Sequence, residues 1–269
     1  MCEKQSSVTV LLPTHRFSED LVTAVESVLA DMERNDELLL VLDGFDNADG
    51  FSQFSEDPRV RLLPHVPGGN LARALNFGIA ASSNEFIARM DGDDIVVPGR
   101  LGTQRSFLNE HPEVMLVGGQ VSRIDGEGRS GGSLGLPTGP DLRSELLVRN
   151  TCTHAAVMLR RSCLMHVGGY DESLSFGEDY EMYLRLALLG PIGNVDKTVL
   201  HYRIHDGQMS KRDRAFSRHT WRILTGRAKL SRQLGISLPI QWSRNFIWFA
   251  AQVARNLGLR NRRPFVDGE

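Results

Sequence analysis

Residues 8–44 read VTVLLPTHRFSEDLVTAVESVLADMERNDELLLVLDG and contain two short aliphatic runs separated by an amphipathic segment. The runs Val8–Leu12 and Leu38–Leu42 have the composition of buried strands, while Glu19–Ala30 repeats apolar residues at helical spacing. This order of strand, helix and strand recurs to about residue 120. It predicts the α/β class, with helices covering a mixed, mostly parallel central sheet.

The remaining elements follow from the same two periodicities and from turn residues. Further strands are expected at Val60–Leu63, Glu85–Met90, Val114–Val117, Ala155–Leu159 and Thr198–Arg203. Further helices are expected at Leu71–Ala81, Pro98–Asn109, Asp141–Arg149 and Glu178–Leu189. Residues 125–140, DGEGRSGGSLGLPTGP, are rich in Gly, Ser and Pro and predict a loop or hairpin of the kind that forms catalytic lids. Beyond Ser210 the sequence predicts two helices.

Charge is distributed unevenly along the 269 residues. The whole chain holds 31 Lys and Arg against 33 Asp and Glu, a balance that argues against a nucleic-acid partner. Residues 211–263 nevertheless hold 13 Lys and Arg and a single acid, Asp213. We expect this tail to pack its apolar faces on the domain or to contact an anionic membrane surface. Trp221, Trp242 and Trp248 lie in it at helical spacing, which favours packing or docking over contact with a sugar.

Cysteine content and hydropathy indicate the compartment. Cys2, Cys152 and Cys163 are too few and too irregularly spaced for a disulfide framework or a cysteine-rich zinc site, so a reducing compartment is expected. Met1–Ser7 contains no apolar signal core, and no stretch reaches the roughly 18 apolar residues that span a bilayer. We therefore expect a cytoplasmic protein, either soluble or peripheral on the inner face of the cytoplasmic membrane.

Polar residues directly after predicted strands are candidates for ligand binding, because ligands of open α/β sheets lie at the carboxyl ends of the strands. Three such segments are Pro13–Arg16, Asp43–Gly44 and Asp91–Asp94, and a fourth polar segment is Gly177–Asp179. Asp91, Asp93 and Asp94 crowd three carboxylates into four residues, where their repulsion favours a bound cation. Hard oxygen ligands suit Mg²⁺ or Mn²⁺. The alternative is an acidic turn that caps the next helix.

These segments resemble glycosyltransferase family 2, which has the GT-A (Rossmann-like) fold, and particularly its bacterial polysaccharide and O-antigen members. The blocks follow the family's order: VTVLLPTHR (8–16), VLDG (41–44), GGNLARALNFGIA (68–80), FIARMDGDDIVVPGRLGTQRSFLNEHPEVMLVGG (86–119), HAAVMLRR (154–161), GGYDESLSFGEDYEMYLRLALLG (168–190) and LHYRIHDGQMS (200–210). The resemblance implies a GT-A domain over 1–210, with a nucleotide-binding half at about 1–120 and an acceptor half at about 121–210. Residues 211–269 are expected to form a basic helical C-terminal extension beyond it.

The resemblance also implies which residues bind the donor nucleotide. Pro13, Thr14 and Asp43 correspond to residues that line the nucleotide pocket, and Asp43 is suited to accept a hydrogen bond from a uracil imide. Arg16 and Arg73 correspond to phosphate or base contacts, because a guanidinium fork matches phosphate oxygens. The alternative for Arg73 is a solvated helix face, and the alternative for Arg16 is likewise a solvated side chain without a role in binding.

The metal site is implied in the same way. Asp91 corresponds to the residue nearer the ribose and Asp93 to a ligand of Mn²⁺ or Mg²⁺, whereas Asp94 is expected to brace the loop. His205, in the Tyr-Arg-x-His block, resembles a histidine that approaches the diphosphate or the metal. The alternative for His205 is a structural role.

The catalytic base is implied by the Glu-Asp pair of the family. Asp179 corresponds to the base, and Glu178 beside it is expected to contact the acceptor or the sugar. Tyr180 and Leu184 belong to an apolar stripe that leaves both acids at the start of a helix. The alternative to the catalytic role is that an acid there only complements the helix dipole. His154, just before a predicted strand, is expected to face the sugar or the acceptor, with a structural role as the alternative. The family implies inversion at the anomeric carbon.

The sequence therefore predicts an inverting, metal-dependent glycosyltransferase of the hexosyltransferase type. Its donor is expected to be a UDP-sugar, and its acceptor a glycan or a polyprenyl-diphosphate-linked glycan of the bacterial surface. A sugar-nucleotide nucleotidyltransferase is the main alternative, but Leu12–Arg16 contains no Gly-rich loop. A non-catalytic carbohydrate-binding relative is a third reading, against which the presence of Asp93 and Asp179 argues. The Gln-x-x-Arg-Trp segment of processive synthases is absent, which favours addition of one sugar per encounter.

Overall fold

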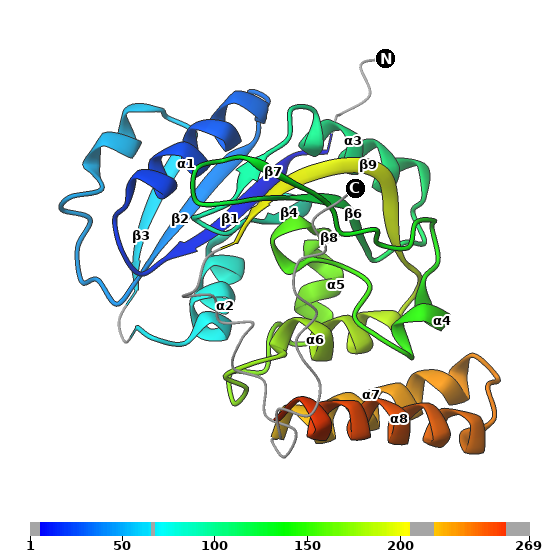
Figure 1. Ribbon diagram of the computed structural model, residues 1–269. Helices are drawn as coiled ribbons and strands as arrows, with labels where there is room; N and C mark the ends of the chain where they lie inside the picture. The colour runs from blue at the N-terminus through cyan, green and yellow to red at the C-terminus, as the bar shows by residue number, and fades with distance from the viewer. Residues whose placement is uncertain (1–5, 66–67, 205–217, 257–269) are drawn as a thin grey trace.

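The computed structural model describes residues 6–65, 68–204 and 218–256, and a mixed sheet lies at its centre (Figure 1). Within these residues the strand order is β3-β2-β1-β4-β8-β6-β9-β5, and β7 pairs with β6. The strands are β1 (Val8–Thr14), β2 (Glu37–Asp43), β3 (Val60–His65), β4 (Phe86–Arg89), β5 (Ile95–Val96), β6 (Leu116–Ile124), β7 (Ser130–Ser133), β8 (Met158–Arg160) and β9 (Ile192–Arg203).

Eight α-helices and two 3-10 turns accompany the strands in the described residues. The α-helices are α1 (Glu19–Asp31), α2 (Leu71–Ala81), α3 (Arg100–Glu110), α4 (Arg143–Leu146), α5 (Arg161–His166), α6 (Glu178–Ala187), α7 (Arg218–Gln233) and α8 (Leu238–Asn256). The 3-10 turns are η1 (Ser52–Glu56) and η2 (His154–Ala156).

The strands β1 to β4 form the parallel half of the sheet. The apolar residues of β1 alternate between two cores, because successive strand side chains point to opposite faces. Val10 and Leu12 pack in the core that contains α1, whereas Leu11 packs in the core that contains α2. A Cβ at Gly78 would lie 2.2 Å from the Leu11 side chain, so only glycine lets α2 come this close to β1. This packing brings the ends of β1, β2 and β4 to one edge.

The other half of the sheet is mixed. The strand β8 runs antiparallel to β4 and β6, and β6 runs parallel to the long, curved β9 (Figure 1). The strand β7 pairs with β6 in antiparallel fashion, so the Gly-rich segment forms a hairpin, one of the two forms predicted for it. The end of β9 pairs with β5, directly after the acidic Asp91–Asp94 segment. The curvature of β9 thus brings Tyr202 and Arg203 to that segment.

The C-terminal hairpin consists of α7 and α8, residues 218–256, and lies against α6 (Figure 1). Ile223 and Leu230 are buried in the same core as Leu184 of α6. A Cβ at Gly226 would lie 3.0 Å from the Leu184 side chain, so glycine lets α7 and α6 approach closely. The prediction of two helices after Ser210 is confirmed, and one face of them packs on the domain. None of the helices in the described ranges is long and apolar enough to cross a membrane.

Element boundaries differ from the predictions where local geometry overrides composition. Ala155 and Ala156 belong to η2, so β8 begins only at Met158. The helix α3 begins at Arg100 rather than Pro98, because Gly99 takes a φ of 86° that stops the helix on its N-terminal side. The short elements α5 and β5 were not predicted, since six and two residues are too few to show a period.

Candidate active site

The acidic segment after β4 gathers three carboxylates. One oxygen of each of Asp91, Asp93 and Asp94 lies within 4.8 Å of the others. Asp94 is fully buried, and its Oδ1 accepts a hydrogen bond from the Arg203 backbone N–H at 2.9 Å. Its Oδ2 is buried without a hydrogen-bond partner among the described residues. Asp94 therefore braces the loop against β9, while one of its oxygens still faces the other two acids.

Burial raises the pKa of both Asp91 and Asp94, and repulsion between the two adds to the effect at Asp94. A raised carboxyl pKa means that the surroundings supply too little positive charge to stabilise the ionised form. Three clustered carboxylates and an unpaired buried oxygen therefore fit a hard divalent cation such as Mg²⁺ or Mn²⁺.

Arg89 is a buried cation beside the acidic segment and was not predicted. It ends β4, is 3% exposed, and its Nη1 lies 2.5 Å from Asp91 Oδ2. Burial disfavours the charged guanidinium, yet Asp91 outweighs that effect and the pKa of Arg89 lies above its usual value. An arginine in an otherwise apolar strand was the available signal, because such a residue is rarely buried without a charged partner.

A cleft of about 660 Å³ opens beside the acidic segment. It collects most of the predicted site residues, although they come from parts of the chain that are far apart. Those that line it are Pro13, Thr14, Arg16, Asp91, Asp93, His154, Glu178 and Asp179. Asp43 and Arg73 are not among the lining residues, and His205 lies outside the described residues.

Glu178 and Asp179 begin α6, where Gly177 caps the helix with a φ of 71°. Asp179 Oδ2 accepts a hydrogen bond from Asn150 Nδ2 at 2.9 Å, and burial raises the pKa of Asp179. Burial, followed by the adjacent Asp179 charge, raises the pKa of Glu178 to about 7. The two acids thus differ in surroundings, since Asp179 is held by an amide donor and Glu178 is partly protonated at neutral pH.

His154 lies in the cleft between the acidic segment and α6. Its Nε2 is 2.9 Å from the Tyr170 hydroxyl, and its ring packs edge-on against Tyr183. Burial, and then the Arg89 charge, holds the pKa of His154 well below its ordinary value, so the imidazole is neutral at pH 7. A neutral imidazole can donate one hydrogen bond to a hydroxyl and accept another from a hydroxyl. Tyr170 was not predicted, although it belongs to the GGYD block.

A second polar group, the Asp43 carboxylate, lies at the end of β2. Asp43 Oδ2 accepts from the Gly69 backbone N–H at 2.9 Å, and Asp43 Oδ1 is buried without a partner among the described residues. A Cβ at Gly68 would lie 2.3 Å from Gly44, so glycine allows the two loops to cross. Arg73, on α2, is 3.5 Å from Glu172 and half-exposed, which places it in a surface ion pair.

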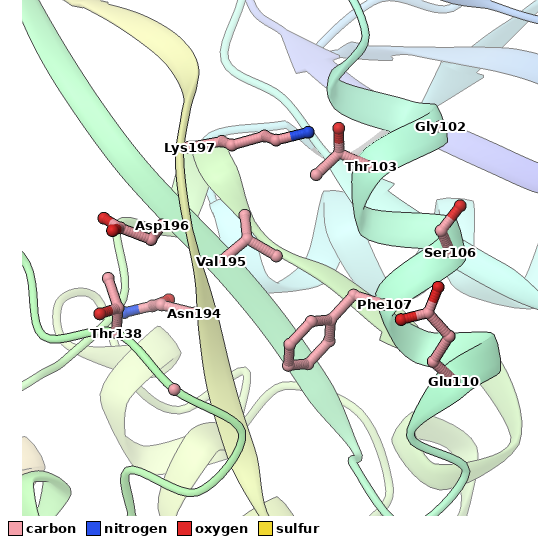
Figure 2. Close-up of a pocket in the computed structure, with 11 residues that line it drawn as sticks. Gly102, Thr103, Ser106, Phe107, Glu110, Thr138, Asn194, Val195, Asp196 and Lys197 are labelled. Atoms are coloured by element: carbon pink, nitrogen blue, oxygen red, sulfur yellow. The ribbon is translucent and has the colours of Figure 1, made fainter.

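A second groove, of about 710 Å³, lies between α3 and β9 (Figure 2). Thr103 and Phe107 of α3 face Val195 and Lys197 across it. None of the predicted site residues that the structure describes lines this groove. The chemistry is therefore expected in the cleft beside Asp91.

A mostly parallel curved sheet with acids at its strand ends is the arrangement of GT-A glycosyltransferases. The family model described as Glycosyl transferase family 2 matches residues 9–168, and one described as Glycosyltransferase like family 2 matches residues 145–235. The first match covers more than half of the chain. The protein therefore belongs to glycosyltransferase family 2.

Two similar curated proteins are bacterial. The amylovoran biosynthesis glycosyltransferase AmsE of Erwinia amylovora is 29% identical over 210 residues, which are 77% of this chain and 79% of AmsE. The O-antigen biosynthesis glycosyltransferase WbnJ of Escherichia coli is 26% identical over 211 residues, 76% of this chain and 82% of WbnJ. The predicted resemblance to polysaccharide and O-antigen members of the family is confirmed.

Solved structures of S. aureus TarS 1–349 share the fold. One aligns with a TM-score of 0.62 at 14% identity and covers 98% of this chain and 95% of that chain. Another, in complex with UDP, aligns with a TM-score of 0.61 at 14% identity and covers 82% of this chain and 65% of that chain. The GT-A prediction is confirmed.

Proposed function

We propose that this protein is an inverting, metal-dependent hexosyltransferase that moves a sugar from a UDP-sugar to a glycan or lipid-linked acceptor in bacterial surface polysaccharide synthesis. The observation that carries the proposal is that one cleft contains both Asp91 and Asp93, at the end of β4, and Asp179, at the start of α6. The names of AmsE and WbnJ support the polysaccharide class, and the UDP complex of TarS supports the donor class.

The donor is proposed to bind across the ends of β1, β2 and β4. Pro13, Thr14 and Arg16 line that end of the cleft. The unpaired Asp43 Oδ1 is proposed to accept a hydrogen bond from the nucleobase, and Arg73 to leave Glu172 for a phosphate. The division into a nucleotide half (about 1–120), an acceptor half (about 121–210) and an extension (211–269) belongs to the same proposal.

Asp93 would hold a Mn²⁺ or Mg²⁺ ion, with Asp91 nearer the ribose and His205 as a further ligand. A cation held there supplies Lewis-acid stabilisation of the diphosphate that leaves. Arg89, paired with Asp91, keeps that carboxylate in place. Asp94 is proposed to hold the acidic segment in place by accepting a hydrogen bond from the Arg203 backbone N–H.

Asp179 is proposed to act as the base. It accepts the proton of the acceptor hydroxyl while that oxygen forms a bond to the anomeric carbon. The bond from that carbon to the phosphate oxygen breaks on the opposite face, and its electron pair leaves with UDP. Asn150 holds the Asp179 carboxylate through the 2.9 Å hydrogen bond, and Glu178 and His154 are proposed to contact sugar or acceptor hydroxyls.

Hydrolysis of nucleotide sugars tests this function. The full chain is incubated with UDP-, GDP- and dTDP-sugars, with Mn²⁺, with Mg²⁺ and with EDTA, and released nucleoside diphosphate is measured. We expect slow, metal-dependent release from a UDP-sugar that is lost in Asp179→Asn. Release that is equal in EDTA, or that favours another nucleotide, would reject the metal or the UDP assignment respectively.

We also propose a peripheral position on an anionic membrane, reached through residues 211–263, on the cytoplasmic side. The described part of this tail, residues 218–256, contains seven Lys and Arg and no Asp or Glu. Its helix α8 turns Ile240, Trp242, Phe246 and Ile247 to solvent, each between 52% and 73% exposed. Exposed apolar side chains beside a basic surface fit anionic lipid, which would bring the cleft to a lipid-linked acceptor.

Vesicle co-sedimentation tests this position. The intact chain should pellet with phosphatidylglycerol vesicles at low salt, stay in solution with phosphatidylcholine, and dissociate in high salt. Phe246→Ser/Ile247→Ser should lower the bound fraction several-fold because the inserted apolar area is lost. Met165→Ser, which alters an exposed apolar residue on α5, is the matched control. Equal pelleting of all three proteins would reject the α8 surface.

A further inference from the structure

The C-terminal hairpin forms part of the catalytic cleft. Ile223 of α7 and Trp248 and Gln252 of α8 line the same cleft as Asp93 and Asp179. They lie on the α6 side of that cleft, away from the β1 end at which Pro13–Arg16 are found. The hairpin is therefore a wall of the site beside the proposed base.

A buried arginine holds this wall on α6. The Arg227 guanidinium lies 5.2 Å from the Tyr180 ring centroid and 4.7 Å from that of Trp248. It also donates hydrogen bonds to the Tyr180 hydroxyl and to the Val148 carbonyl, both at 2.8 Å. We call this set of contacts, in which the Arg227 guanidinium lies against the Tyr180 and Trp248 rings, the clamp. Because Tyr180 directly follows Asp179, the clamp fixes the position of the Trp248 indole relative to the proposed base.

The wall also presents an amide to the cleft. Gln252 is 6% exposed as a residue, and it lines the cleft beside Trp248. A side-chain amide both donates and accepts hydrogen bonds, so it is suited to bind a ligand hydroxyl. Trp248 is half-buried, and the part of its indole not covered by Arg227 lines the cleft beside Ile223.

We infer that this wall is the binding site for the acceptor, and that it takes a sugar ring of that acceptor. A pyranose has an apolar face of C–H groups, which suits Trp248 and Ile223, and a rim of hydroxyls, which suits the Gln252 amide. The inference rests on the proposed function and names the substrate class of its second site. Trp248 thereby differs from Trp221 and Trp242, which are exposed on the hairpin and carry no part of the cleft.

Tryptophan fluorescence tests the inference without turnover. In Trp221→Phe/Trp242→Phe, Trp248 is the only tryptophan of the chain. This protein, with UDP and Mn²⁺, is titrated with methyl and octyl glycosides of the common hexoses and N-acetylhexosamines. We expect saturable quenching by at least one methyl glycoside. In the complementary Trp248→Phe protein, which retains the other two tryptophans, the same sugar should cause no change.

Two further substitutions in the single-tryptophan protein report on the amide. Gln252→Leu should raise the Kd of the quenching glycoside roughly three- to tenfold, the effect of one lost hydrogen bond. Gln233→Leu is the matched control, because Gln233 is exposed on α7 and donates to the Leu188 carbonyl rather than lining the cleft. Circular dichroism checks that each variant is folded.

The outcomes separate this inference from the function. No quenching by any methyl glycoside, quenching that requires the octyl chain, or an unchanged Kd in Gln252→Leu would each overturn the sugar site, even if UDP-sugar hydrolysis is intact. Absence of metal-dependent UDP-sugar hydrolysis in the wild-type chain would instead overturn the proposed function, whatever the fluorescence result.

Discussion

The raised pKa of Glu178 predicts that the free energy of unfolding changes with pH, and this change can be measured without substrate. Burial and the Asp179 charge raise its pKa to about 7 in the folded protein, from 4.5. Between these two values the unfolded chain has released the proton while the folded chain still holds it. The free energy of unfolding should therefore be highest below pH 4.5 and fall as the pH rises through 7, by about 3 kcal/mol from this group.

Glu178→Gln keeps the size of the side chain and removes its titration. Relative to wild type, the variant should be equally stable near pH 4.5 and more stable at pH 8 by about 3 kcal/mol. Urea unfolding of metal-free protein in EDTA, followed by circular dichroism from pH 4 to 8, measures this difference. Glu145→Gln, which removes an exposed acid from α4, should give a curve parallel to wild type. A Glu178→Gln difference that stays constant with pH would refute the reasoning.

Three further predictions concern the site and its support. Asp93→Ala should leave the thermal unfolding temperature near that of wild type but abolish the Mn²⁺ dependence of UDP affinity in isothermal titration; an unchanged affinity would remove Asp93 from the metal site. Asp179→Asn should bind UDP normally and lose about 10²- to 10⁴-fold in turnover, because the amide cannot accept the proton; near-normal turnover would assign the base elsewhere. Arg227→Met should lower the free energy of unfolding by about 2–4 kcal/mol, through the two lost ring contacts and an unpaired Val148 carbonyl, and a urea midpoint equal to wild type would contradict the clamp.

Local patterns determined the elements and much of the site. Val8–Leu12 and Leu38–Leu42 are strands, and Asp91, Asp93 and Asp179 lie in one cleft, as expected for polar residues at strand and helix ends. Such features can be predicted from the sequence because the hydrophobic pattern of a strand or helix is set by residues that are close together in the chain. The metal, base and donor roles remain proposals.

Only the tertiary structure decided which distant residues complete the cleft. Asp94 is held by Arg203, more than a hundred residues later, Asp179 is held by Asn150, and the Tyr170 hydroxyl meets His154. Which face of the basic tail packs on the domain is a second feature that the sequence pattern did not predict. Its composition indicated helices and a charged surface, but the packing of Gly226 and Arg227 on α6 decides which face of α8 meets the cleft and which meets solvent. The reason is physical: a period defines a face of a helix, whereas the partner of that face depends on the close packing of side chains from the whole fold.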